Sequence, residues 1–202
     1  MYPVGFPGRA EVGAYILAGG ASRRMGRDKA RLELGGESVV RMLARRFEPH
    51  VCNVALVAKP WQRFADLGLA IVHDASREHA LVHGMRAALA GAGPPWRLLL
   101  ACDMPGVGPE LLGILWGAAR AASAPGACLC PEDRTDADPL PSLWRADVAA
   151  RVRESWGLTA RDWLRHAGLA VVRVPAAAVP ANVNTPSEWR SYRDGGAGRT
   201  IP

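Results

Sequence analysis

Short apolar runs alternate along this chain with segments in which apolar residues recur at helical spacing. Such runs, bounded by turn residues, are typical of buried strands, and the helical repeat indicates amphipathic helices. The pattern predicts strands at residues 12–17, 51–57, 69–72, 97–102, 127–130, 140–144 and 169–174. It predicts helices at residues 39–47, 60–68, 81–89, 111–122 and 186–192, with two short helical patterns between residues 146 and 166. Strands that are apolar on both faces and alternate with helices favour a sheet covered on both sides. The sequence therefore predicts an α/β protein with three layers, α/β/α, and a doubly wound, mostly parallel sheet.

The same pattern indicates one domain. No internal repeat divides it, and 202 residues are enough to bury a sizeable core. We expect a single domain at residues 12–192, an N-terminal extension at residues 1–11 and a flexible tail at residues 193–202. The first residues contain no apolar stretch of the signal-peptide type, so we expect a cytoplasmic protein.

Composition excludes two classes of protein. Apolar residues make up 49% and charged residues 22%, which is wrong for a disordered chain. The longest apolar runs fall far short of the ~20 residues that a membrane-spanning helix needs, so we expect no membrane partner. Four cysteines lack paired metal spacing, and we interpret them as reduced thiols; redox or metal chemistry at Cys128 and Cys130 is the alternative.

The chain is basic, with a net charge of +6. This balance suits a protein that holds several phosphates as well as one that binds nucleic acid. The basic residues do not form the one-sided runs of a nucleic-acid binder, so we expect no nucleic-acid partner. The exception is a local cluster, which comprises Arg23, Arg24, Arg27, Lys29 and Arg31.

Glycine and aspartate follow three of the predicted strands. Gly19 and Gly20 follow the first strand, Asp74 follows the strand at 69–72, and Asp103 follows the strand at 97–102. Ligands of doubly wound sheets bind at the carboxyl ends of the strands. The sequence therefore predicts one crevice at this edge of the sheet.

The loop from Leu17 to Lys29 has the chemistry of a phosphate site. It is neither a P-loop nor a dinucleotide fingerprint, because the glycine spacing differs from both. Glycines nevertheless let a ligand approach the backbone, and arginine and lysine can bind phosphate oxygens. Of the 25 basic residues only Lys29 and Lys59 are lysine, which favours a specific role for Lys29. The alternative is a glycine-rich turn with a solvated basic face.

The motif L-A-G-G-x-S-x-R-M-G-x-D-K at residues 17–29 resembles the signature of the MobA-like nucleotidyltransferases, in particular the molybdenum cofactor guanylyltransferases. Residues 72–74 (V-H-D), 101–105 (A-C-D-M-P) and 182–188 (N-V-N-T-P-S-E) agree with that family in order and spacing. The resemblance covers about residues 12 to 190 and implies a Rossmann-like nucleotidyltransferase fold. It also implies transfer of GMP from GTP to the terminal phosphate of molybdopterin, with release of pyrophosphate.

The resemblance assigns roles to individual residues. It implies that Lys29, Arg24 and Asp103 are catalytic, with Lys29 and Arg24 holding phosphates and Asp103 binding Mg²⁺. The implied nucleotide-binding residues are Leu17, Ala18, Gly19, Gly20, Lys29, Asp74 and Asp103, and those on the molybdopterin side are Asn182 and Asn184. Handing over a labile pterin suggests transient contacts with molybdenum-cofactor biosynthesis proteins or recipient molybdoenzymes.

Local roles remain as alternatives for several of these residues. Asp103 could cap the next helix, Asp74 could be a turn aspartate, and the two asparagines could be turn or cap residues before Pro186. Arg23 and Arg27 are expected to be solvated or steering charges. The histidines at 73, 79 and 83 look like a metal trio, but we interpret them as surface or structural residues.

Departures from the family pattern keep two other functions open. The stretch at residues 79–84 lacks the Gly-Pro-Leu or Gly-Gly turn of many members, with only Leu81 and Gly84 suggestive of it, and the strand near Val57 lacks an asparagine that some members direct at the base. A cytidylyltransferase acting on the same cofactor is one alternative, although that branch typically reads L-A-A-G at the first motif. A non-catalytic nucleotide-binding module is the other. The acidic stretch at 133–139 is either a lid or a solvated loop, and the scattered tryptophans indicate packing.

Overall fold

The computed structural model describes residues 5–20, 22, 24–148 and 159–195. Within these residues a sheet of seven strands has the order β5-β4-β1-β6-β8-β7-β9. The strands are β1 (Val12–Leu17), β4 (Asn53–Ala58), β5 (Ala70–His73), β6 (Trp96–Ala101), β7 (Gly126–Pro131), β8 (Ser142–Arg145) and β9 (Ala170–Val174). β8 runs antiparallel to its neighbours β6 and β7, and the other pairs are parallel. The predicted mostly parallel sheet is confirmed.

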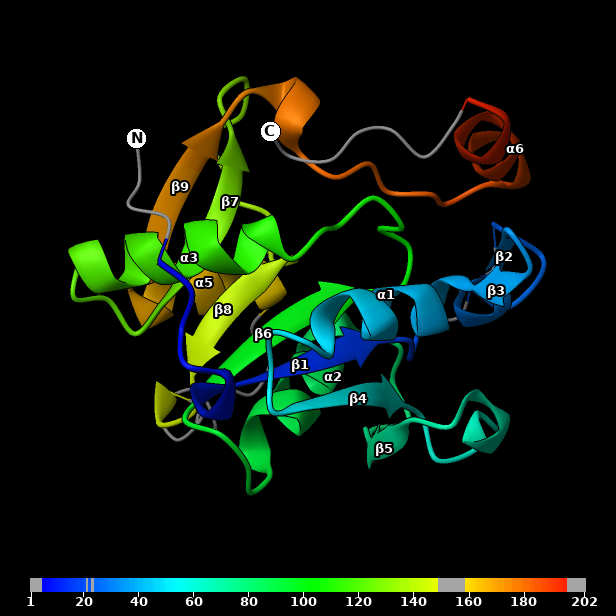
Figure 1. The fold of residues 1–202 in the computed structure, drawn as a ribbon, viewed down its shortest axis with the longest axis horizontal. Coiled ribbons are helices and arrows are strands. Elements are labelled where there is room, and N and C mark those ends of the chain that lie inside the picture. The colour runs from blue at the N-terminus through cyan, green and yellow to red at the C-terminus, as the bar shows by residue number, and fades with distance from the viewer. Residues whose placement is uncertain (1–4, 21, 23, 149–158, 196–202) are drawn as a thin grey trace.

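Among the described residues, five helices cover the sheet and its edge: α1 (Val39–Phe47), α2 (Leu81–Ala90), α3 (Glu110–Ala121), α5 (Ala160–Ala167) and α6 (Pro186–Asp194). Figure 1 shows α1 and α3 on one face of the sheet and α2 on the other. Side chains of successive strand residues point to opposite faces. Ala14 and Ile16 of β1 therefore join a core with α1, α3 and α6, and Tyr15 and Leu17 join a core with α2 and α5. These two cores make the three predicted layers.

Several local expectations are corrected by the structure. The turn at Gly35 and Gly36, both at positive φ, closes an unpredicted hairpin of β2 (Glu33–Leu34) and β3 (Glu37–Ser38). The helix predicted at 60–68 is only a 3₁₀ turn, Ala65–Leu67. α6 includes Arg193 and Asp194, which we expected in the tail. The first of the two helical patterns predicted between residues 146 and 166 falls largely on residues 149–158, which lie outside the described residues.

Tryptophan packing is confirmed at Trp144, Trp163 and Trp189, which are buried. Trp61 is different, because 53% of its surface is exposed. Trp156 lies outside the described residues. None of the helices in the described part of the chain is long and apolar enough to cross a membrane.

Arg97 of β6 is a buried cation that binds carbonyl groups at the C-terminal end of α2. Its guanidinium donates to the carbonyl oxygens of Ala88 at 2.7 Å and Gly91 at 2.6 Å, and it lies 5.3 Å from the Tyr15 ring centroid. Arg97→Met removes the donor from the buried Ala88 carbonyl group and also breaks the part-buried bond to Gly91, so we expect the free energy of unfolding to fall by about 2–3 kcal/mol. Urea unfolding measures this change. The exposed Arg120→Met is the control, expected within about 0.5 kcal/mol of wild type; equal losses in both variants would contradict the role of Arg97.

Candidate functional site

A cavity of about 390 Å³ lies at the carboxyl ends of β1, β4 and β6, beside the start of α2. This volume is in the range of small-molecule sites. The predicted site residues that line it are Leu17, Ala18, Gly19, Gly20, Lys29, Asp74, Asp103, Asn182 and Asn184. Arg24 is the predicted residue outside the lining, but its guanidinium lies 3.4 Å from the Asn184 side-chain oxygen. The predicted crevice is therefore present where the strand exits placed it.

The fold does not require glycine at either Gly19 or Gly20, the two residues that follow Ala18 after β1. A Cβ on Gly19 would meet its nearest neighbour, Lys59 Cε, at an ordinary 3.7 Å, and a Cβ on Gly20 would meet nothing within 4 Å. Both residues lack a positive φ, which would favour glycine. A Cβ would fit at both positions, and its absence leaves room for a flat ligand to approach the backbone.

Lys29 joins three segments that are far apart in the sequence. Its Nζ lies 2.9 Å from Asp103 Oδ2 and 2.6 Å from Asn184 Oδ1. Asp28 caps the 3₁₀ turn Lys29–Arg31 by accepting from the Ala30 N–H at 3.0 Å, and Ser22 Oγ accepts from the Lys29 N–H at 3.3 Å. The local turn thus directs the ammonium group into the cavity.

The segment with the two asparagines is held beside Asp103 by its backbone. The N–H of the buried Val183 donates to the Asp103 carbonyl oxygen at 2.8 Å. The cap of α6 is Thr185, so capping does not explain Asn182 or Asn184. Asp103 is likewise not the cap of α3, where Pro109 stands.

Glu188 orders this segment through two backbone hydrogen bonds. Its Oε2 accepts from the N–H of Asn184 at 2.6 Å and of Thr185 at 3.0 Å, and these bonds, Asn184 first, lower the pKa of Glu188. A lowered pKa stabilises the fold above the ordinary glutamate value of about 4.3, and this contribution disappears as pH falls through the lowered pKa. We expect Glu188→Gln to lower the melting temperature at pH 7 and to match wild type at strongly acidic pH. Thermal unfolding across pH checks this; a difference that does not change with pH would contradict it.

Three carboxylates line the cavity, and each has a cationic partner. Asp103 pairs with Lys29, Asp74 pairs with Lys59 at 2.6 Å, and Asp138 lies 3.4 Å from Arg134. Paired carboxylates repel a polyanion less than free ones do. The pairing therefore makes the cavity compatible with a phosphate-bearing ligand.

Asp74 combines the two roles that the sequence left open. It lines the cavity, and its Oδ1 also accepts from the Ser76 N–H at 3.0 Å, as a turn aspartate does.

The stretch at 133–139 contributes Asp138 and Pro139 to the cavity wall, and Asp136 is paired with Arg165 at 2.8 Å.

Two of the cysteines, Cys102 and Cys128, are buried thiols without the features of a nucleophile. Cys102 lines the cavity, but burial raises the pKa of its thiol far above the ordinary range. Burial also raises the pKa of Cys128 to about 12. A buried thiol that stays protonated is a poor nucleophile and a poor metal ligand. All four cysteines are free.

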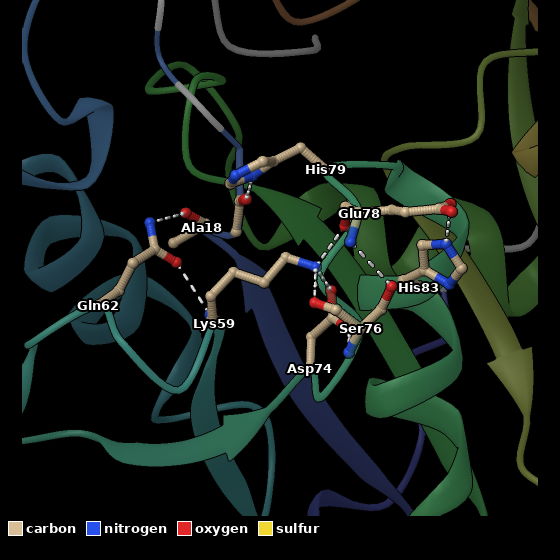
Figure 2. A network of polar contacts seen from close by, with 9 residues as sticks. Ala18, Lys59, Gln62, Asp74, Ser76, Glu78, His79 and His83 are labelled. Carbon is tan, nitrogen blue, oxygen red and sulfur yellow. Dashed lines mark hydrogen bonds and ion pairs between the residues drawn. The ribbon is translucent and has the colours of Figure 1, made fainter.

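Sequence reasoning missed three polar residues that contact the lining of the cavity, shown in Figure 2. Lys59 is buried, Gln62 donates to the Ala18 carbonyl oxygen at 3.2 Å, and His79 Nδ1 lies 2.9 Å from the Gly19 carbonyl oxygen. The scarcity of lysine in this chain was the one available signal for Lys59. His79 is exposed, as expected of a surface or structural residue, and it also lines the cavity. Among the described residues no cluster of three or more potential ligands could hold a metal, and the three histidines form no such cluster.

A model of the MobA-like NTP transferase domain matches residues 14–172 of the chain. The chain belongs to the MobA-like NTP transferase family. As a MobA-like protein it is a nucleotidyltransferase, and the family expected from the motifs is confirmed. The matched range runs from β1 into β9 and includes the whole cavity wall except Asn182 and Asn184.

Relatives of this MobA-like chain match it over most of its length. The probable molybdenum cofactor guanylyltransferase of a Nostoc species is 30% identical over 191 residues, which are 87% of each chain. The molybdenum cofactor guanylyltransferase of Pseudomonas aeruginosa is 31% identical over 188 residues, 89% of this chain and 93% of the relative. The solved molybdopterin-guanine dinucleotide biosynthesis protein A from Archaeoglobus fulgidus has a TM-score of 0.69 at 21% identity and covers 90% of this chain and 97% of its own. That structure shows the shared fold.

Proposed function

We propose that this chain transfers GMP from GTP to the terminal phosphate of molybdopterin, forming molybdopterin guanine dinucleotide and pyrophosphate. The observation that carries the proposal is the meeting of Lys29, Asp103 and Asn184 at one end of the cavity. The names of the relatives, guanylyltransferases of the molybdenum cofactor, supply the substrates.

The reaction requires positioning and charge neutralisation more than covalent chemistry. An oxygen of the molybdopterin phosphate attacks the α-phosphorus of GTP, and the bond from that phosphorus to the bridging oxygen of the β-phosphate breaks. Two polyanions must therefore approach each other. Lys29 and Arg24 would hold the phosphates of GTP and the departing pyrophosphate, Lys29 as a point charge and Arg24 as a fork. Asn182 and Asn184, whose amides can donate and accept, would hold the pterin side.

The donor set fits Mg²⁺ that arrives with the triphosphate. Mg²⁺ is usually held by one or two carboxylates together with substrate phosphates and water. Asp103 offers one such carboxylate in the cavity, and its side chain is 22% exposed. The ion, when bound, would neutralise charge on the triphosphate. We therefore propose Mg²⁺ dependence with Asp103 as the protein ligand.

Backbone and carboxylate groups would select the base. Leu17, Ala18 and Gly19 line the cavity and would present their backbone to it. Guanine carries two adjacent donors, N1–H and the 2-amino group, whereas the corresponding edges of adenine and cytosine carry an acceptor. A carboxylate accepts only, so Asp74 in the cavity wall favours guanine.

Partners and location follow from the same function. Transient contacts with molybdenum-cofactor biosynthesis proteins or recipient molybdoenzymes would protect the labile pterin. The free cysteines are in keeping with the reducing cytoplasm.

The first experiment is calorimetric titration of the protein with GTP, CTP and ATP, each with Mg²⁺ and with a chelator. We expect GTP to bind most tightly. Pyrophosphate release from GTP in the presence of molybdopterin then tests catalysis. Preference for CTP would move the assignment to a cytidylyltransferase, and GTP binding without turnover would indicate a non-catalytic module.

A further inference from the structure

Lys59 is an ammonium group enclosed by protein. Only 1% of its side chain is exposed, and its three N–H groups are all engaged. They donate to Asp74 Oδ2 at 2.6 Å, to the Ser76 carbonyl oxygen at 2.8 Å and to the Glu78 carbonyl oxygen at 2.5 Å. Figure 2 shows the ammonium at the centre of these three acceptors. The ammonium therefore has no N–H group left for a ligand, and Lys59 does not line the cavity.

Its partner Asp74 does face the cavity. The side chain is 5% exposed, and Oδ2 lies 4.0 Å from the position of a Cβ on Gly19. Oδ1 is fixed by the Ser76 N–H. Each carboxylate oxygen can accept more than one hydrogen bond, so both can still bind a donor on a ligand. Lys59 therefore determines the position of a carboxylate whose remaining acceptor capacity is directed at the cavity.

The same residue links both sides of the base-binding wall. The backbone N–H of Lys59 donates to Gln62 Oε1 at 2.9 Å, and the side-chain amide of Gln62 donates in turn to the Ala18 carbonyl oxygen. On the other side, the loop that Lys59 holds at Ser76 and Glu78 ends in His79, which contacts the Gly19 carbonyl oxygen. Because a carbonyl oxygen only accepts, His79 carries its hydrogen on Nδ1.

We propose that Lys59 is a positioning residue for base recognition, which acts on the nucleotide through Asp74 and the loop from Ser76 to His79. This inference rests on the proposed function, in which Asp74 binds the donor edge of guanine. A buried carboxylate without its cation is strongly disfavoured, and removal of Lys59 takes away both the charge partner and the anchor of the loop. The burial of a paired cation directly behind an acceptor in a ligand cavity is the observation that carries the proposal.

A double-mutant cycle tests whether Lys59 acts through Asp74. The variants are Lys59→Met, Asp74→Asn and the double variant, and the measurement is calorimetric titration of the full chain with GTP and with ITP, whose base lacks the 2-amino group. We expect wild type to prefer GTP to ITP. Lys59→Met should weaken GTP binding by about tenfold or more and remove most of that preference. In the Asp74→Asn background the same substitution should change GTP affinity by less than about twofold.

Two further measurements separate positioning from a general effect on the fold. Lys59→Met should raise KM for GTP more than it lowers kcat, because Lys59 does not contact the phosphates. Glu78→Ala is the matched control, since its side chain contacts His83 and only its retained backbone carbonyl contacts Lys59. It should keep the GTP preference. The proposal would be overturned if Lys59→Met weakened the binding of GTP and of ITP equally, and did so both in the wild-type and in the Asp74→Asn background.

The experiment also distinguishes this inference from the proposed function. If wild type binds CTP most tightly, the guanylyltransferase proposal fails and the cycle is scored on CTP affinity. If Lys59→Met does not fold, as judged by circular dichroism, the comparison of Asp74→Asn with the double variant decides. If GTP affinity is much lower in the double variant than in Asp74→Asn, Lys59 does not act through Asp74. If wild type binds no nucleotide, both proposals are overturned.

Discussion

Replacement of Asp103 by asparagine should abolish metal-dependent turnover while the fold stays intact. The fold survives because Val183 is held by the Asp103 carbonyl oxygen, which the substitution retains. The carboxylate is the group proposed to bind Mg²⁺, and loss of such a group typically lowers kcat by about 10²- to 10³-fold or more. Pyrophosphate release measures the rate, and thermal unfolding confirms the fold.

Nucleotide binding by the Asp103→Asn variant gives a sharper readout than activity. For wild type, we expect GTP to bind more tightly with Mg²⁺ than with a chelator. The variant should lose this difference, and its metal-free affinity should equal or exceed that of wild type because one negative charge near the phosphates is gone. Asp138→Asn is the control, because Asp138 lines the same cavity and pairs with Arg134. Metal dependence that persists in Asp103→Asn would remove Asp103 from the metal site.

Much of the site could be predicted from the sequence because it lies at strand ends. Apolar runs mark buried strands, and the exits of neighbouring parallel strands meet at one edge of a sheet. Gly19, Asp74 and Asp103 are therefore brought together by topology alone. Asn182 and Asn184 are not part of a periodic pattern, and only the family motif indicated them. Their place beside Asp103 depends on long-range contacts that no local pattern encodes, namely the backbone hydrogen bond from Val183 to Asp103 and the contact of Lys29 with Asn184.

The features that sequence reasoning missed depend on tertiary polar contacts. The segment after Lys59 has a helical pattern, but Gln62 is used to bridge the Lys59 N–H and the Ala18 carbonyl oxygen, and the chain turns there instead. The antiparallel direction of β8 cannot be read from a short apolar run. Lysine and histidine are usually exposed, so burial of Lys59 and the contact of His79 with Gly19 follow only once Asp74 and the glycine loop are placed.

Replacement of Lys29 by methionine should weaken GTP binding and slow turnover together. Lys29 is the one cation in the described lining of the cavity, and its loss leaves the Asp103 carboxylate without its partner beside a triphosphate. Loss of a charged hydrogen bond typically costs about 1.5–3 kcal/mol, which corresponds to about 10- to 150-fold in affinity. We expect kcat for pyrophosphate release to fall further, because charge develops on the leaving group in the transition state. Titration with GTP and steady-state kinetics measure the two effects.

A control in the same loop separates specific contact from general attraction. Arg27 is exposed and lines a neighbouring hollow together with Gly20 and Trp61. Arg27→Met should change GTP affinity by about twofold or less, and the change should shrink as salt is added, because exposed charges are screened. The loss in Lys29→Met should persist at high salt, since Lys29 is mostly enclosed, with 14% of its side chain exposed. GTP affinity and rate that are unchanged in Lys29→Met, or a loss that salt removes as it does for Arg27→Met, would show that Lys29 acts only through the general basic charge of the loop.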